Sequence, residues 1–216
     1  MTETMTTNNR DRAPIDERIA AAGSPSIWVG DRVQLRGYEP EDIEFEAAYE
    51  ENTIDQRSGW KAFPPRSSVA RKNWNEEASA AKMEGDAVDF RLVVARRSDN
   101  LIVGGVNPHS VDLINGTFRF GISVADEHKG HGYASEAVLL LLRYMFDERR
   151  FQKCGSEAHA YNTASLALHR KLGFVEEGRL RRNVFVGGGY HDTVMLGMTV
   201  EEFHELYPKL RVRLTR

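Results

Sequence analysis

Two glycines, Gly130 and Gly132, stand one residue apart in a polar segment between an apolar stretch and a long amphipathic one. A glycine has no side chain, so its backbone can approach a ligand closely. A helix directly behind them would present free N–H groups and the positive end of its dipole, which favour a phosphate. His128 and Lys129 add positive potential. The segment predicts a pyrophosphate-binding loop, with a plain glycine-rich turn as the alternative, because Gly-x-Gly alone is a weak signal.

A dinucleotide-binding Rossmann turn is the competing interpretation of these glycines. The third glycine of its G-x-G-x-x-G pattern is replaced by Ser135, and the five residues 125–129 separate the preceding strand from Gly130. A Rossmann turn is tighter than this and follows a βαβ unit, whereas the preceding strands have the pattern of hairpins. The loop therefore favours a pyrophosphate bound outside a Rossmann fold.

The elements before the loop begin with a strand at 27–36 and a helix opened by Pro40, since proline suits the first helical turn. A second helix is expected over 67–82. Strands at 89–95 and 101–106 are separated by a turn at 98–100, and Asn115-Gly116 is a strong hairpin turn between two further apolar stretches. The pattern predicts three consecutive antiparallel strands.

The elements after the loop begin with a helix over 130–148, because its apolar residues recur at helical spacing. A strand follows near 153–160, and Asn162 can cap a helix that ends at Gly173. Further elements are expected as strands at 174–177 and 193–198 and a helix at 201–207. This order predicts the α/β class, with one mixed, mostly antiparallel central sheet and helices on both faces.

Residues 1–24 carry no clear apolar period, and we interpret them as a flexible or subunit-docking extension of a single domain over 25–216. The chain has 41% hydrophobic and 28% charged residues and a net charge of −3, which are typical of a globular protein without a nucleic-acid partner. Its single cysteine allows no intrachain disulfide and no cysteine-based metal cluster. No secretory signal or membrane-spanning stretch is visible, so we expect a cytoplasmic protein without a membrane partner. The reaction implied by the resemblance described below requires no metal, so none is expected.

The loop and three later segments together resemble the GNAT superfamily of N-acetyltransferases. Residues 128–132 resemble its pyrophosphate loop, with Gly132 at the last position. The run GYASEA at 132–137 is similar to the ribosomal-protein-type (RimJ/RimL-like) branch. The downstream segments similar to that branch are NTAS at 162–165, KLGF at 171–174 and GYHD at 189–192. The resemblance covers roughly residues 30 to 200 and implies a GNAT-like acyl-CoA N-acyltransferase fold with acetyl-CoA as acetyl donor.

The resemblance also implies where acetyl-CoA binds. The strand before the loop would part from its neighbour, and pantetheine would lie in the gap against the main chain of Ile122, Ser123 and Val124. Asn162 would contact the cofactor, act as a helix cap, or do both. The backbone N–H groups that would hold the pyrophosphate, with His128 beside them, belong to Lys129, Gly130, His131, Gly132, Tyr133 and Ala134.

The reaction implied is direct transfer of acetyl from the thioester to a neutral amine, which needs a proton acceptor and help for the departing thiolate. Many relatives carry a glutamate where this chain has Arg119, two residues before Gly121, and a tyrosine where it has His169. His169 is therefore the candidate proton donor, since histidine titrates near neutral pH. Ser165 or a water molecule is the alternative, and a surface role for His169 stays open.

The acceptor is an amine, either a protein N-terminus or a small molecule such as an amino acid or an antibiotic. The absent glutamate and tyrosine leave a non-catalytic acyl-CoA-binding module as another hypothesis. A basic cluster of Arg179, Arg181 and Arg182 would attract an acidic acceptor or CoA phosphates, or form a solvated face. Relatives are often dimers, so a homodimer is possible.

Overall fold

The computed structural model describes residues 14–59, 62–81, 88 and 90–211. One seven-stranded sheet has the order β1-β2-β3-β4-β5-β7-β6. Only the β4–β5 pair is parallel. The strands are β1 Val33–Arg36, β2 Leu92–Arg96, β3 Ile102–Asp112, β4 Thr117–Val124, β5 Lys153–His159, β6 Val175–Val186 and β7 Gly189–Thr199. The mixed, mostly antiparallel sheet predicted from the sequence is confirmed.

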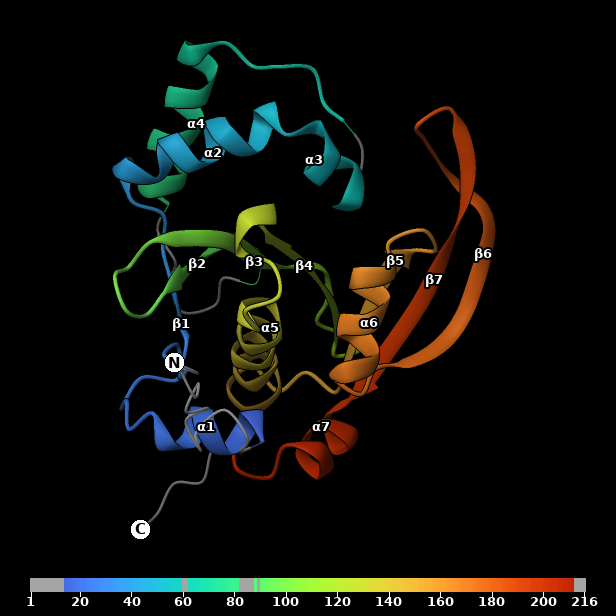
Figure 1. Cartoon of the computed structure of the whole chain (residues 1–216). Coiled ribbons are helices and arrows are strands. Elements are labelled where there is room, and N and C mark those ends of the chain that lie inside the picture. The colour runs from blue at the N-terminus through green and yellow to red at the C-terminus, as the bar shows by residue number, and fades with distance from the viewer. Residues whose placement is uncertain (1–13, 60–61, 82–87, 89, 212–216) are drawn as a thin grey trace, which may run out of the picture.

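Seven α-helices accompany the sheet in the described residues. They are α1 Ile15–Ala21, α2 Ile43–Glu51, α3 Thr53–Gly59, α4 Ser68–Ser79, α5 Tyr133–Arg143, α6 Thr163–Lys171 and α7 Val200–Leu206. Short 3-10 turns precede α2 and α5, and a π-helical segment, Tyr144–Glu148, continues α5. Figure 1 shows α2, α3 and α4 together above β2–β4, with α5 below. No helix in the described residues is both long and apolar enough to cross a membrane.

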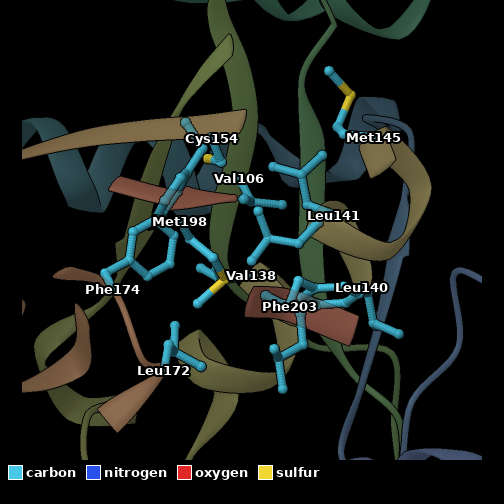
Figure 2. Close-up of a cluster of buried hydrophobic side chains, with 14 of the residues drawn as sticks. Val106, Val138, Leu140, Leu141, Met145, Cys154, Leu172, Phe174, Met198 and Phe203 are labelled. Carbon is cyan, nitrogen blue, oxygen red and sulfur yellow. The ribbon is translucent and has the colours of Figure 1, made fainter. Parts of the chain in front are cut away.

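The two faces of the sheet bury different sets of residues, because side chains alternate along a strand. Leu92 and Val94 of β2 belong to the main core, which α5, α6 and α7 cover. Val93 and Ala95 point the other way and pack near Phe45 of α2 in a smaller cluster. Figure 2 shows the main core, where side chains of α5 meet those of the central strands and of α7. We call the face of the sheet that carries Val93 and Ala95, opposite the main core, the α2–α4 face.

Three parts of the fold differ from the sequence-based expectation. The segment 1–24 contains α1, whose Ile19 is buried in the main core, while residues 1–13 lie outside the described residues. A role of this segment in docking a partner subunit stays a prediction. The short helix α3 was not expected. Strands β6 and β7 form an outer hairpin and are much longer than the predicted strands at 174–177 and 193–198. The sequence did not predict their full length, because most β6 side chains are exposed and do not alternate between apolar and polar.

Candidate active site

The glycine loop adopts a backbone conformation that glycine favours. Gly130 and Gly132 have φ of 82° and 83°, in the left-handed region. Gly132 is the N-cap of α5, and no side chain caps this helix start. The helix therefore begins at Tyr133 rather than at Gly130. Its first backbone N–H groups have no carbonyl one turn earlier to bond, so they are placed to receive an anion.

The loop also has the space that a pyrophosphate needs. A Cβ added to Gly130 would meet no described atom within 4 Å, and one added to Gly132 would meet only the Arg32 guanidinium, at 3.9 Å. Arg32 donates from Nη1 to the His131 carbonyl at 3.0 Å, which holds its positive charge against the loop. The Lys129 ammonium pairs with Asp126 at 2.8 Å and so contributes less net charge. These features fit a bound pyrophosphate.

Arg32 was not found from the sequence, because it comes from the β1 segment about a hundred positions before the loop. Glu136, in the first turn of α5, fixes that segment in place. Its Oε1 accepts from the backbone N–H of Arg32 at 2.8 Å and of Val33 at 3.2 Å. Burial raises the pKa of this carboxyl, and the two backbone donors act in the opposite direction. We call the glycine loop and the first turn of α5 the cradle. The buried Glu136 carboxylate thus connects the cradle to β1 at the edge of the sheet.

Strands β4 and β5 part in the middle of the sheet. Their parallel pairing covers only Thr117–Arg119 against Lys153–Gly155. Beyond it, Ile122, Ser123 and Val124 of β4 still pair with β3 on their other side. The far half of β4 therefore has one edge without a strand partner, leading directly into the glycine loop. This is the geometry in which an extended amide-containing chain such as pantetheine can add to a strand edge.

Asn162 is confirmed as the cap of α6. Its Oδ1 accepts from the backbone N–H of Ser165 at 3.0 Å. Its Nδ2 donates to the Ser58 carbonyl of α3 at 2.6 Å, and the neighbouring Tyr161 hydroxyl donates to the Arg57 carbonyl at 2.6 Å. The amide thus holds α3 over the end of β5. A contact of Asn162 with the cofactor stays a prediction.

His169 is 2% exposed and lies on α6 between Phe120 and Phe174. Its Nδ1 is 2.7 Å from the Ser165 carbonyl oxygen, so Nδ1 carries a hydrogen, and Nε2 accepts from the Ser156 hydroxyl at 2.7 Å. Burial lowers the pKa of His169 and favours this neutral tautomer. The surface alternative for His169 is wrong. The Ser165 hydroxyl lies 3.5 Å from Nδ1.

Ser156 was also not found from the sequence. It lies on β5 one residue beyond Gly155, the last residue paired with β4, and its side chain is buried on the same face as α6. Its alternation with Cys154 and Ala158, both in the main core, is the signal that could have placed it there. The cluster of His169, Ser156 and Ser165 therefore lies at the point where the two strands part.

A pocket of about 770 Å³ opens in the β6–β7 hairpin and is lined by Arg179, Leu180, Arg181, Arg182, Asn183 and Asp192. It lies where β6 is irregular, between Leu180 and Val184. Arg182 has a φ of 51°, and its backbone N–H donates to Asp192 Oδ1 at 2.9 Å. The adjoining part of β7 pairs with the Ala158–His159 end of β5. We call the end of the sheet at which β4 and β5 have parted the open end. The basic cluster of Arg179, Arg181 and Arg182 thus lies beside this open end.

Known proteins resemble this chain in sequence and in fold. Residues 32–175 match the model of the acetyltransferase (GNAT) domain. The SPbeta prophage-derived uncharacterized N-acetyltransferase YokL of Bacillus subtilis is 37% identical over 82% of this chain and 96% of its own length. The putative ribosomal N-acetyltransferase YdaF of the same organism is 30% identical over 49% of this chain and 57% of its own.

A solved structure of spermidine N-acetyltransferase from Vibrio cholerae, in complex with CoA and spermine, superposes with a TM-score of 0.66. It is 25% identical and covers 79% of this chain and 97% of its own. The sheet order, the parting strands and the glycine cradle agree with these similarities, and the Rossmann alternative is wrong. The chain belongs to the GNAT family and is an acetyl-CoA-dependent N-acetyltransferase.

Proposed function

We propose that the enzyme acetylates the α-amine of a polypeptide N-terminus. The observation that carries this proposal is the charge around the open end of the sheet. Three arginines of the β6–β7 hairpin, Arg179, Arg181 and Arg182, lie there with the carboxylates of Glu176 and Asp192. The Arg119–Glu157 ion pair lies on the neighbouring strands β4 and β5. A net positive rim attracts acceptors that carry negative groups beside the reacting amine and repels polycations. A protein N-terminus followed by acidic residues meets this requirement.

A polyamine acceptor is the second candidate, favoured by the similarity to the Vibrio cholerae enzyme solved with spermine. Spermine and spermidine carry several positive charges, which a rim of arginines disfavours. The 30% identity to a putative ribosomal N-acetyltransferase instead supports the RimJ/RimL-like branch and a protein acceptor. We therefore place small-molecule acceptors second.

The proposed binding mode of acetyl-CoA uses the two open features of the site. The N–H groups around Gly130–Ala134 hold the pyrophosphate, with His128 and Arg32 adjacent. The free edge of β4 over 122–124 receives the pantetheine arm. The thioester then lies where β4 and β5 part, and the acceptor approaches from the α2–α4 face. The acceptor nitrogen attacks the thioester carbonyl carbon, the C–S bond breaks, and the sulfur leaves as the thiol.

His169 and Ser165 are proposed to act on the leaving sulfur through Ser156. Because Nε2 carries no hydrogen in the neutral ring, it first takes up a proton that the acceptor amine loses. It then donates to the Ser156 oxygen, and the hydroxyl hydrogen of Ser156 becomes free to pass to the sulfur. A hydrogen bond aimed at developing negative charge stabilises the transition state more than the ground state. Ser165 keeps Nδ1 engaged through its carbonyl, which fixes the orientation of the ring.

His169→Phe is expected to lower kcat about 100-fold, the lower range for loss of a positioned acid or base. The affinity for acetyl-CoA should stay within about threefold, because the ring bonds to Ser156 and Ser165 and not to the glycine loop. Stopped assays of CoA release, with calorimetric titration of acetyl-CoA, would measure both. An unaltered kcat in a folded variant would remove His169 from the mechanism.

The acceptor assignment is tested with matched amines at equal concentration. The set comprises a peptide with acidic residues after its first position, the same peptide with lysines there, its N-formylated form, and spermidine. The acidic peptide is expected to exceed spermidine about tenfold or more in kcat/KM, because the arginine rim repels the polyamine. The formylated peptide should be inert. Preference for spermidine, or for the lysine peptide, would contradict the proposal.

We also propose a cytoplasmic location, supported by the single cysteine, which is buried and free. A homodimer, expected from the resemblance, stays a prediction that light scattering of the purified protein would test.

A further inference from the structure

Glu157 occupies a particular place on β5. The β4–β5 pairing ends at Gly155, and Glu157 is the next residue of β5 whose side chain points to the same face as Gly155. That face is the α2–α4 face, since Cys154, Ser156 and Ala158 are buried toward the opposite one. The carboxylate therefore lies at the opening between the two strands, on the side from which the acceptor is proposed to enter.

Arg119 of β4 holds this carboxylate in place. Its Nη1 lies 3.3 Å from Glu157 Oε2, and the two side chains are 38% and 29% exposed. The resemblance implies a glutamate at the position of Arg119 on β4; in this chain the carboxylate beside the opening is Glu157, on the neighbouring strand. The guanidinium also lies over Gly155, which has no side chain to displace it.

The second carboxylate oxygen of Glu157 is available to a ligand. Among the described residues, Oε1 has no hydrogen-bond partner, while Oε2 has Arg119. Across the opening, the β4 residue after Arg119 on this face is Gly121. A Cβ at Gly121 would lie 3.0 Å from the Asn107 amide oxygen, so Gly121 leaves room for the Asn107 side chain and adds no side chain of its own to this face.

This geometry points to Glu157 as the proton acceptor of the reaction. The ammonium form of the acceptor transfers one proton from nitrogen to Glu157 Oε1, and the neutral amine forms a bond to the thioester carbonyl carbon. The C–S bond then breaks, its electron pair stays on sulfur, and the second amine proton ends on that sulfur. Glu157 returns its proton to solvent before the next cycle. Arg119 is a positioning residue that holds the carboxylate at the opening.

The other titratable groups that face Glu157 are few. His109 of β3 is paired in register with Arg119, and His159 follows Glu157 on the same face of β5. On β6, Arg179 pairs with Val194, the register partner of Ala158, so its side chain lies on the opposite face. The helix α3, which packs against β5, carries Arg57. Arg119 is the group in direct contact with the Glu157 carboxylate.

The inference rests on the proposed transfer to an amine but not on which amine is the natural acceptor. Glu157→Gln keeps the size of the side chain and removes the base. We expect kcat/KM for the acidic peptide and for spermidine alike to fall about 100-fold at pH 7. The deficit should shrink as the pH rises, because more of the acceptor is then already neutral. If only spermidine is turned over, the protein-acceptor proposal fails while Glu157 is still tested.

Glu177→Gln is the matched control. Glu177 is also ion-paired across strands, with Lys153, but at the end of the sheet where β4 and β5 remain paired. It should keep full activity. In a third variant, Arg119→Gln, kcat should fall about tenfold while the affinity for acetyl-CoA stays within about threefold, because the carboxylate is no longer held at the opening. A purely structural ion pair would leave kcat unchanged in the folded variant.

Folding and cofactor binding are measured separately for every variant, by thermal unfolding and by titration with acetyl-CoA. The inference is overturned if Glu157→Gln binds acetyl-CoA normally and retains kcat/KM within about threefold at every pH. A uniform loss at all pH values, without recovery at high pH, would also overturn it, because such a loss reports altered positioning rather than a missing base.

Discussion

Gly132→Glu is expected to weaken CoA binding on the order of 100-fold, equivalent to about 2.8 kcal/mol. The change adds a carboxylate where the pyrophosphate should lie, next to the Arg32 guanidinium, with which the new side chain can pair. It also places a side chain at a φ of 83°, which costs about 1–3 kcal/mol of backbone strain. Calorimetric titration with CoA measures the loss directly.

Gly188→Glu separates the two effects. Gly188 has a φ of 84°, and a Cβ there would meet no described atom within 4 Å, so it carries the same strain and the same added charge at the tip of the β6–β7 hairpin. Its CoA affinity should equal that of the wild type. Equal losses in both variants, or an unchanged affinity in folded Gly132→Glu, would sink the assignment of the loop as the pyrophosphate cradle.

The parts of the fold that the sequence predicts well are those governed by local interactions. The Asn115-Gly116 turn, the cap formed by Asn162 and the amphipathic stripe of α5 each depend on residues close together in the chain. The glycine loop belongs to this class, because its left-handed backbone is set at Gly130 and Gly132 themselves. Its role as a cofactor site still needs the binding experiment.

The parts that could not be predicted depend on residues far apart in the chain. Arg32 reaches the loop only because β1 lies beside α5, and the register of that contact is fixed by Glu136. The ion pair between Arg119 and Glu157 depends on two strands joined by a long helical crossover. Neither contact produces a repeating pattern of residue types in the sequence from which it could be predicted. The helix α1 was missed because its apolar side consists of little more than Ile15 and Ile19.

Arg119 is interpreted differently from the sequence and from the fold. In the sequence, Arg119 stands where the resemblance implies a glutamate base, which made a non-catalytic binding module a reasonable hypothesis. In the fold, Arg119 faces a carboxylate on the next strand, so both charges remain at the same opening. A sequence motif records positions on one strand, whereas a reaction depends on which atoms meet across strands.

Gly104→Ala addresses the strand that is proposed to hold pantetheine. Gly104 of β3 pairs with Val124 of β4, and a Cβ at this position would overlap the Ser123 carbonyl oxygen and lie 2.9 Å from its carbon. The contacted atoms are backbone, so β4 itself must shift. We expect the free energy of unfolding to fall by about 1–3 kcal/mol, the usual cost of overpacking. The affinity for CoA should fall about tenfold, since a misplaced strand edge loses part of its hydrogen bonding.

Gly105→Ala supplies the control one residue away on the same strand. A Cβ there would lie 3.5 Å from the Tyr38 hydroxyl and 3.6 Å from the Leu92 carbonyl oxygen, which are ordinary contact distances. Its stability should change by less than about 1 kcal/mol, because alanine also restricts the unfolded chain. Denaturant unfolding measures the stability of both variants, and CoA titration measures their affinity for CoA. Loss of stability in Gly104→Ala with unchanged CoA affinity would mean that the 122–124 edge does not carry the cofactor, since the displaced atoms belong to that edge.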